Sequence, residues 1–181
     1  MTIRTAQDVL DFWFSDAMTP HWFAKSDAID DSIRHRFADT YHAAHRRELD
    51  GWAATPDGAL ALVIVLDQFP RNIFRGTGRA FESDDIALDH ARAAVDAGFD
   101  RQIPPDRRAF LYLPFEHSED LPDQTRSVEL FEALGIPDYL DYAIRHREIV
   151  ARFGRFPHRN LLLDRPDTPD EEEFLKTHKG F

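Results

Sequence analysis

The chain contains no cysteine, which excludes a disulfide framework and any metal site built from thiolates. It also lacks a long hydrophobic stretch, because the longest apolar run, residues 59–66, is far too short to cross a bilayer. At the start there is no basic segment followed by an apolar core and a cleavage site, so no secretory signal is predicted. These absences predict a soluble cytoplasmic protein with no membrane partner.

Lysine is scarce, and the cationic side chains are mostly arginine. Lysine occurs only at Lys25, Lys176 and Lys179, among 22 lysine and arginine residues in all. Arginine makes forked contacts with carboxylate or phosphate groups, although a GC-rich genome would favour it as well. The formal net charge of -11 repels nucleic acid and anionic lipid, so we expect neither as a partner.

Capping residues and prolines divide nearly the whole chain into helices. Thr5 and Asp8 have the spacing of a capping box, while Thr55 and Thr168 each precede a proline at a first helical position. No alternating run of β-branched residues indicates a sheet. We therefore predict an all-α fold, a single domain of stacked antiparallel helix pairs over residues 1–181.

Three expectations concern where particular helices begin, end or bend, and a fourth concerns the burial of an apolar segment. A helix that begins near Ser26 is expected to stop at Gly51, and Ser83 is expected to cap a later helix. Pro114 should kink or divide the helix in which it lies. Residues 59–66 are apolar on all sides, which predicts a central buried helix and leaves a buried strand as the alternative.

Two phrases that contain Phe-Pro follow predicted helices. The first FP phrase is QFPRN at residues 68–72, and the second FP phrase is RFPHRN at residues 155–160. Each proline is expected to end its helix, with arginine and asparagine at the exposed helix end. These side chains could simply satisfy bare carbonyls and nearby acids. Alternatively, the arginines converge into a pocket for a carboxylate or phosphate. The candidate ligand-binding residues are Asp67, Gln68, Arg71, Asn72, Arg75, His117, Arg152, Arg155, His158, Arg159 and Asn160.

The phrase LPFEHSED at residues 113–120 gathers carboxylates around His117. Its Glu-His-x-Glu order matches neither the Glu-x-x-His of bundle metal sites nor the His-Glu-x-x-His of zinc proteases. We therefore expect no metal site, and nothing in the sequence indicates a cofactor. His117 and His158 are candidates for acid–base catalysis, with Glu119 orienting the imidazole. The acids expected to neutralise the arginines are Asp67, Glu116, Glu119 and Glu148.

Several stretches together resemble the landmarks of a bacterial family known as domain of unknown function 924. They are VLDFWF, HWF at His21, LDQFPRNIFRG, LPFEHSEDL and RFGRFPHRN, which span nearly the whole chain. The resemblance implies a fold like that of tetratricopeptide repeats, a right-handed superhelix of helix pairs, although no strict repeat period is visible. It implies no established activity and leaves the function open.

The sequence is compatible with three functions. The arginines favour a protein that binds a small anionic ligand or an acidic peptide tail. An enzyme acting on an anionic substrate through histidine and glutamate is the second possibility. A structural or assembly protein without a ligand pocket is the third.

Overall fold

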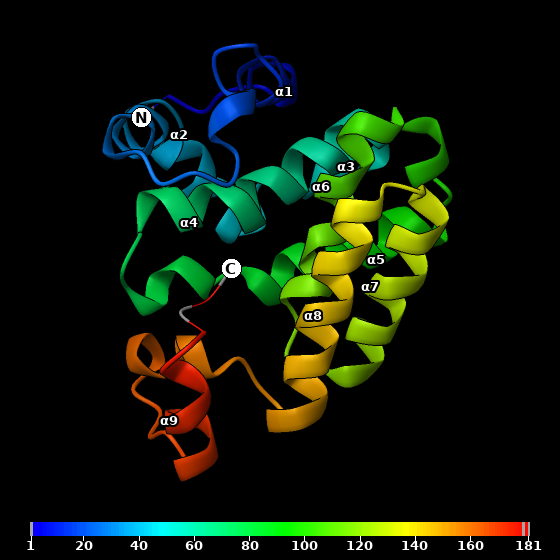
Figure 1. Cartoon of the computed structure of the whole chain (residues 1–181). Helices are drawn as coiled ribbons and strands as arrows, with labels where there is room; N and C mark the ends of the chain where they lie inside the picture. The colour runs from blue at the N-terminus through cyan, green and yellow to red at the C-terminus, as the bar shows by residue number, and fades with distance from the viewer. Residues whose placement is uncertain (1, 179, 181) are drawn as a thin grey trace.

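Helices form all the regular secondary structure in the computed structural model, which describes residues 2–178 and 180 (Figure 1). The all-α class is therefore confirmed, whereas the tetratricopeptide-like superhelix stays a prediction. The α-helices are α1 (Ala6–Trp13), α2 (Asp27–His45), α3 (Pro56–Val63), α4 (Phe69–Ile73), α5 (Asp84–Asp96), α6 (Pro105–His117), α7 (Leu121–Leu134), α8 (Pro137–Phe153) and α9 (Pro169–Leu175). A π-helical turn, η3 (Ile64–Gln68), joins α3 to α4, and short 3-10 helices are η1 (Thr19–His21), η2 (Asp50–Ala54), η4 (Gly78–Phe81), η5 (Asp100–Gln102), η6 (Pro157–Arg159) and η7 (Leu161–Leu163).

Local capping explains many of the helix boundaries. Thr5 and Thr168 each form a complete capping box, and the hydroxyl of Thr55 accepts a hydrogen bond from the first turn of α3. Gly135 and Gly154 end α7 and α8 in the left-handed conformation, with φ values of 76° and 69°. These boundaries confirm the predictions made from the sequence.

Two predicted boundary signals were wrong, the stop at Gly51 and the cap by Ser83. The helix that begins after Ser26 ends at His45, well before Gly51, which lies inside η2 instead. Ser83 precedes α5, but its buried hydroxyl donates to the carbonyl oxygen of Leu66 at 2.6 Å and makes no cap. Ser83 therefore ties the start of α5 to the buried helix beneath it.

Pro114 neither divides nor ends α6, which runs unbroken to His117. The missing N–H of proline costs one helical hydrogen bond, but the residues around it are buried in the core. Packing of this helix against its neighbours therefore outweighs the local cost.

The apolar residues 59–66 form a buried helix, so the alternative of a buried strand was wrong. Its last part is the π-turn η3, which inserts an extra residue into the helix and is a frequent feature of functional sites. The chain then enters α4 directly, with Pro70 in the first turn, where its missing N–H is tolerated. The prediction that Pro70 ends the helix was therefore wrong, and the first FP phrase lies within the helix.

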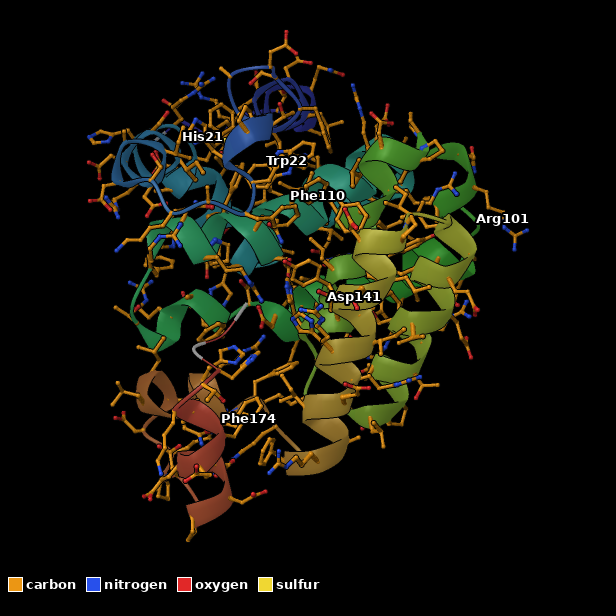
Figure 2. All side chains as sticks on the ribbon, in the orientation of Figure 1. His21, Trp22, Arg101, Phe110, Asp141 and Phe174 are labelled. Atoms are coloured by element: carbon orange, nitrogen blue, oxygen red, sulfur yellow. The ribbon has the colours of Figure 1, made fainter. Side chains whose placement is uncertain are left out.

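An aromatic cluster fills the core where α1, α2, α4 and α6 meet. Ring centroids lie 4.8 Å apart for Phe37 and Phe69, and 5.5 Å apart for Trp13 and Phe110. Trp22 and Phe110 are neighbours in Figure 2, and their rings pack edge-on with centroids 4.7 Å apart. Such tilted and edge-on pairs stabilise the core beyond simple area burial.

Helices α6, α7 and α8 follow one another through short connections, residues 118–120 and 135–136, and α7 and α8 lie side by side in Figure 1. After α8 the chain passes through η6 and η7, where Arg159 reaches Asp84 at the start of α5 and residue 162 lies against Gly78 of η4, before α9 begins. This return brings the second FP phrase towards the first. Within residues 2–178 and 180, no helix combines the length and the apolarity that a bilayer crossing requires.

Candidate functional site

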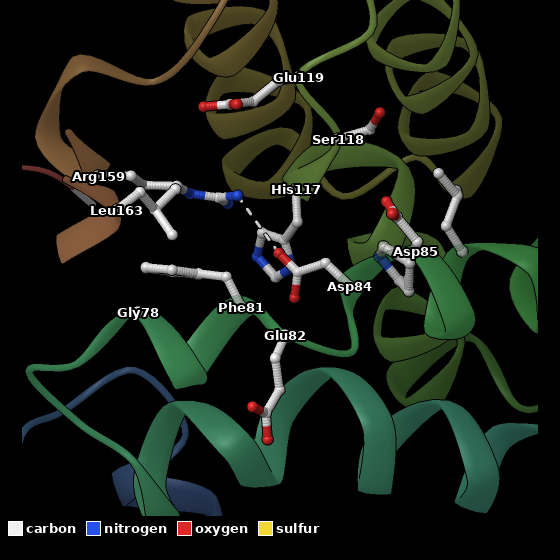
Figure 3. Close-up of a pocket in the computed structure, with 12 residues that line it drawn as sticks. Gly78, Phe81, Glu82, Asp84, Asp85, His117, Ser118, Glu119, Arg159 and Leu163 are labelled. Atoms are coloured by element: carbon white, nitrogen blue, oxygen red, sulfur yellow. Dashed lines mark hydrogen bonds and ion pairs between the residues drawn. The ribbon is translucent and has the colours of Figure 1, made fainter. Parts of the chain in front are cut away.

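An open cavity of about 390 Å³ lies where η4 and α5 face the end of α6 and the returning segment η6–η7 (Figure 3). Phe81, Asp84, His117, Glu119 and Arg159 are among the residues that line it. A glycine at position 78 permits this arrangement, because a Cβ there would lie 2.5 Å from the carbonyl oxygen of residue 162. The close approach of η4 to η7 therefore helps to form one wall of the cavity.

His117, which lines the cavity from the end of α6, forms a hydrogen-bonded pair with Asp67. Asp67 belongs to the π-turn η3, and its side chain is fully buried. Its Oδ1 lies 2.7 Å from Nδ1 of His117. Its Oδ2 accepts a hydrogen bond from the side-chain amide of Gln68 at 2.6 Å. Burial alone would raise the pKa of Asp67, but Arg71 and His117 outweigh it and hold the pKa well below its usual range. Asp67 is therefore a carboxylate and can only accept.

The tautomer of His117 follows from this partner. Because the Asp67 carboxylate can only accept, the Nδ1–H of His117 donates to it. Burial and the neighbouring Arg71 lower the pKa of His117, against the opposing effect of Asp67, so the imidazole is neutral at pH 7. Nε2 is then a hydrogen-bond acceptor, and it has no hydrogen bond to the part of the chain that the structure describes.

The arginines of the two FP phrases meet at one carboxylate, that of Asp84. Arg71 donates two hydrogen bonds to it, from Nη1 to Oδ1 at 2.9 Å and from Nη2 to Oδ2 at 3.1 Å. Arg71 also donates to the main-chain oxygen of Asp67. Arg159 reaches the same carboxylate through Nη1 at 3.3 Å, from 75 residues further along the chain. The convergence of these two phrases, which the sequence left open, is therefore present in the structure.

Arg159 is a buried cation whose hydrogen bonds are incomplete. It is 7% exposed, and its guanidinium lies 4.5 Å and 4.7 Å from the ring centroids of Phe81 and Phe156. Burial lowers its pKa to about 10, so it stays charged at pH 7. Among residues 2–178 and 180, only its Nη1 has a hydrogen-bond partner, while Nε and Nη2 have none.

Glu119 does not orient the imidazole, as the sequence had suggested. Its carboxylate accepts two hydrogen bonds from Arg165, at 2.6 Å and 2.9 Å, and a third from the main-chain N–H of Phe156 at 2.7 Å. The prediction for Glu119 was therefore wrong, and Asp67 takes that role. The salt bridge instead ties the end of α6 to the segment that carries Arg159.

Asn72 of the first FP phrase and Arg75, which follows the phrase, make their contacts outside the cavity, with α2. Arg75 makes a forked contact with Asp30, with Nη2 at 2.8 Å from Oδ1, and the side-chain amide of Asn72 donates to the same oxygen at 2.8 Å. These contacts satisfy Asp30, which is buried. Arg75 and Asn72 therefore link α4 to α2.

Arg155 of the second FP phrase and Arg152, which precedes the phrase, also form their ion pairs outside the cavity. Arg152 pairs with Asp170 at 2.6 Å, and Arg155 makes a forked contact with Glu171 at 2.7 Å and 2.8 Å. Both ion pairs line a second cleft of about 450 Å³ beside α9. Because each cation there faces an acid, this cleft offers little spare charge.

Asn160 and His158 of the second FP phrase are not among the residues that line the cavity. The amide of Asn160 donates to Asp167 at 2.7 Å. Burial and then Arg159 lower the pKa of His158 to about 4, so its imidazole is neutral at pH 7. Neither side chain lines the cavity.

Glu116 and Glu148 do not neutralise arginines, and Asp84 and Asp30 take this role instead. Glu116 is buried between α6 and α8, with Oε1 at 3.3 Å from Nδ1 of His146. Burial and then the Asp67 charge raise the pKa of Glu116 to about 8, so it is mostly protonated at pH 7. Sequence reasoning missed Asp84 because an acid in the first turn of a helix is ordinary.

Within the described part of the chain, no group of three or more histidine or acidic side chains is arranged to hold a metal ion. The site therefore offers an imidazole acceptor and an arginine with spare donors beside a cavity.

A family described as bacterial protein of unknown function, DUF924, matches residues 9–179 of the chain. The chain is also similar to a solved structure, the protein of unknown function ATU0120 from Agrobacterium tumefaciens. The two share 46% sequence identity with a TM-score of 0.91, over 96% of this chain and 97% of the other. A comparison with curated proteins gave no match.

Proposed function

The chain belongs to the bacterial DUF924 family of proteins of unknown function, and we propose that this member binds a small anionic ligand, a carboxylate or phosphate, beside Arg159. The incomplete hydrogen bonding of Arg159 carries the proposal. Both oxygens of Asp84 already accept from Arg71, so Arg159 gains only one long contact with that carboxylate. A buried cation with spare donors gains from an anionic partner, which a ligand would supply.

The size of the cavity favours a small molecule over an acidic peptide tail. Its volume of about 390 Å³ lies at the lower end of the range for small-ligand sites, roughly 300–1,000 Å³. Apolar side chains, including Phe81 and Leu163, cover part of the wall and would contact the carbon skeleton of the ligand.

Substituting Arg159 with methionine is expected to weaken the binding of small anions about 10- to 100-fold, because charge-assisted hydrogen bonds to the anion are lost. The measurement is a thermal-shift and calorimetric titration with phosphate, acetate, butyrate and succinate, since ligands that bind the folded form raise its melting temperature. Arg159→Lys keeps the charge without the fork and is expected to bind with intermediate affinity.

The control is Arg152→Met, which removes the same charge from a solvent-exposed ion pair outside the cavity. It should leave anion binding unchanged. Equal stabilisation of the wild type and Arg159→Met by these anions, or no response of the wild type to any of them, would contradict an anion site and favour a purely structural role for the arginines.

The second candidate function is an enzyme in which His117 acts as a general base, and the Asp67–His117 pair favours it. A buried carboxylate at 2.7 Å from Nδ1 fixes the tautomer and would stabilise the imidazolium that forms when Nε2 accepts a proton. The ligand held by Arg159 would then lie beside a proton acceptor.

This candidate predicts the protonation of His117 at pH 7. We expect ¹⁵N NMR of the side chain to show a proton on Nδ1, none on Nε2, and a pKa below the ordinary histidine value. Asp67→Asn should move the proton to Nε2, because the asparagine amide can donate to Nδ1. A proton on Nε2 in the wild type would rule out His117 as the base.

A further inference from the structure

More carboxylates than cations line the cavity, and one of these carboxylates forms no ion pair with the residues the structure describes. Asp84 is shared by Arg71 and Arg159, and Glu119 is paired with Arg165. The remaining acids are Glu82, which pairs with Arg79 and accepts from Tyr41, and Asp85. Asp85 makes no ion pair or hydrogen bond with any of the residues the structure describes, although it lines the cavity.

The three groups with unused capacity are arranged across the cavity. Figure 3 shows Arg159 and Asp85 on opposite sides of His117, and all three line the same cavity. Nη2 of Arg159 has no hydrogen-bond partner among the described residues, and Nε2 of His117 is an acceptor. A ligand spanning the cavity would therefore meet a cation at one end, an acceptor near the middle and a carboxylate at the other end.

We propose that the ligand is zwitterionic, a small amino acid whose carboxylate binds Arg159 and whose protonated amine faces Asp85 and Nε2 of His117. This proposal rests on the anion site proposed above and adds a binding site for the amine of the ligand. Complementary charges at both ends give specificity, because a ligand with only an anion would face the carboxylate of Asp85, which is exposed and forms no ion pair with the residues the structure describes. The apolar wall formed by Phe81, Leu163 and neighbouring residues would contact the methylene groups between the two charges.

Asp85 also lies in the first turn of α5, where an acid stabilises the positive end of the helix dipole. That role concerns the stability of the helix and predicts no preference among ligands. The buried, under-bonded Arg159 on the other side of the cavity is an independent indication of a ligand. A preference for ligands with an amine is therefore expected if Asp85 contacts the ligand, and is not expected if Asp85 only stabilises the helix.

The test compares 4-aminobutyrate with butyrate and butylamine, which each lack one of its charges, by calorimetry or NMR titration of the intact protein. The wild type is expected to bind 4-aminobutyrate about tenfold or more tightly than butyrate, because the amine adds a charge-assisted contact. Unbranched amino acids from glycine to 6-aminohexanoate would then show which separation of charges fits the cavity.

Asp85→Asn should remove most of the preference for 4-aminobutyrate while leaving the affinity for butyrate equal or higher. Asp96→Asn is the matched control, because it removes the same charge from the exposed far end of α5. It should leave the preference intact. Arg159→Met should weaken 4-aminobutyrate and butyrate together.

The possible failures are distinguishable. Butyrate that binds as tightly as 4-aminobutyrate, with both lost in Arg159→Met, would overturn the zwitterion and leave the anion site standing. An amine preference that survives Asp85→Asn, or that falls equally in Asp96→Asn, would overturn the assigned role of Asp85. Binding of neither compound to the wild type would overturn both proposals.

Discussion

Replacing Asp67 with alanine is expected to lower the free energy of unfolding by about 3–5 kcal/mol, the usual cost of breaking a buried ion pair. The Asp67 side chain is fully buried and accepts from His117 and Gln68 while facing Arg71. Without it, Arg71 and Arg159 would share the single carboxylate of Asp84 in a poorly solvated site. The measurement is urea unfolding at pH 7, followed by circular dichroism.

The control for Asp67→Ala is Asp31→Ala, which breaks an exposed pair with Arg34. Exposed pairs contribute little, so this variant should lose less than about 1 kcal/mol. Because the pKa of Asp67 is held below its usual range, its contribution to stability is present above the unfolded-state pKa and is lost as the pH falls. If Asp67→Ala is no less stable than Asp31→Ala at pH 7, the buried pairing described here is wrong.

Replacing Glu116 with methionine is expected to raise the free energy of unfolding at pH 7 by roughly 2–3 kcal/mol. The pKa of Glu116 is about 8 in the folded protein, against a reference value of 4.5. Between these two values the folded state binds a proton that the unfolded state has released, so Glu116 lowers stability as the pH rises through this window. Methionine fills similar space and removes the buried carboxyl, while His146 keeps its contact with the carbonyl oxygen of Tyr142.

The difference between Glu116→Met and the wild type should be small near pH 5 and grow until about pH 8. Urea unfolding at one-unit pH intervals measures it. Glu132→Met, an exposed position on α7, is the control and should change stability by less than about 0.5 kcal/mol. A constant difference across this pH range would show that Glu116 has an ordinary pKa in the folded state.

Helix starts and stops could be predicted where their cause is local. The capping box at Thr5 depends on Asp8, three residues away, and the left-handed turn at Gly154 depends on glycine itself. Ser83 has the same local signal for a helix cap, but its hydroxyl donates a hydrogen bond to the carbonyl oxygen of Leu66, 17 residues earlier. The π-turn before Pro70 likewise has no local signal, since the packing of a buried helix decides where an extra residue can be inserted.

The candidate site was partly visible in the sequence for the same reason. Arg159 and His117 stood out because arginine and histidine were concentrated in short phrases with aromatic residues. Asp84 did not stand out, because it resembles any acid at a helix start. Its significance comes from Arg159, 75 residues away, and a contact at that separation depends on the fold as a whole.

The number of arginines in the sequence also predicted a larger binding site than the cavity provides. Arg75, Arg152 and Arg155 each find a carboxylate on an adjacent helix and lie outside the cavity. Composition shows how many cations are present, but their pairing depends on which acids the helices bring within reach. Only Arg159 combines burial, a place on the cavity wall and unused donors within the described residues.

A crystal structure of the protein grown with saturating 4-aminobutyrate tests the anion site at Arg159 most directly. We predict a ligand in the cavity between η4 and η6, with its carboxylate within hydrogen-bond distance of Nη2 of Arg159. An empty cavity under these conditions, or a ligand whose carboxylate lies away from Arg159, would contradict this account.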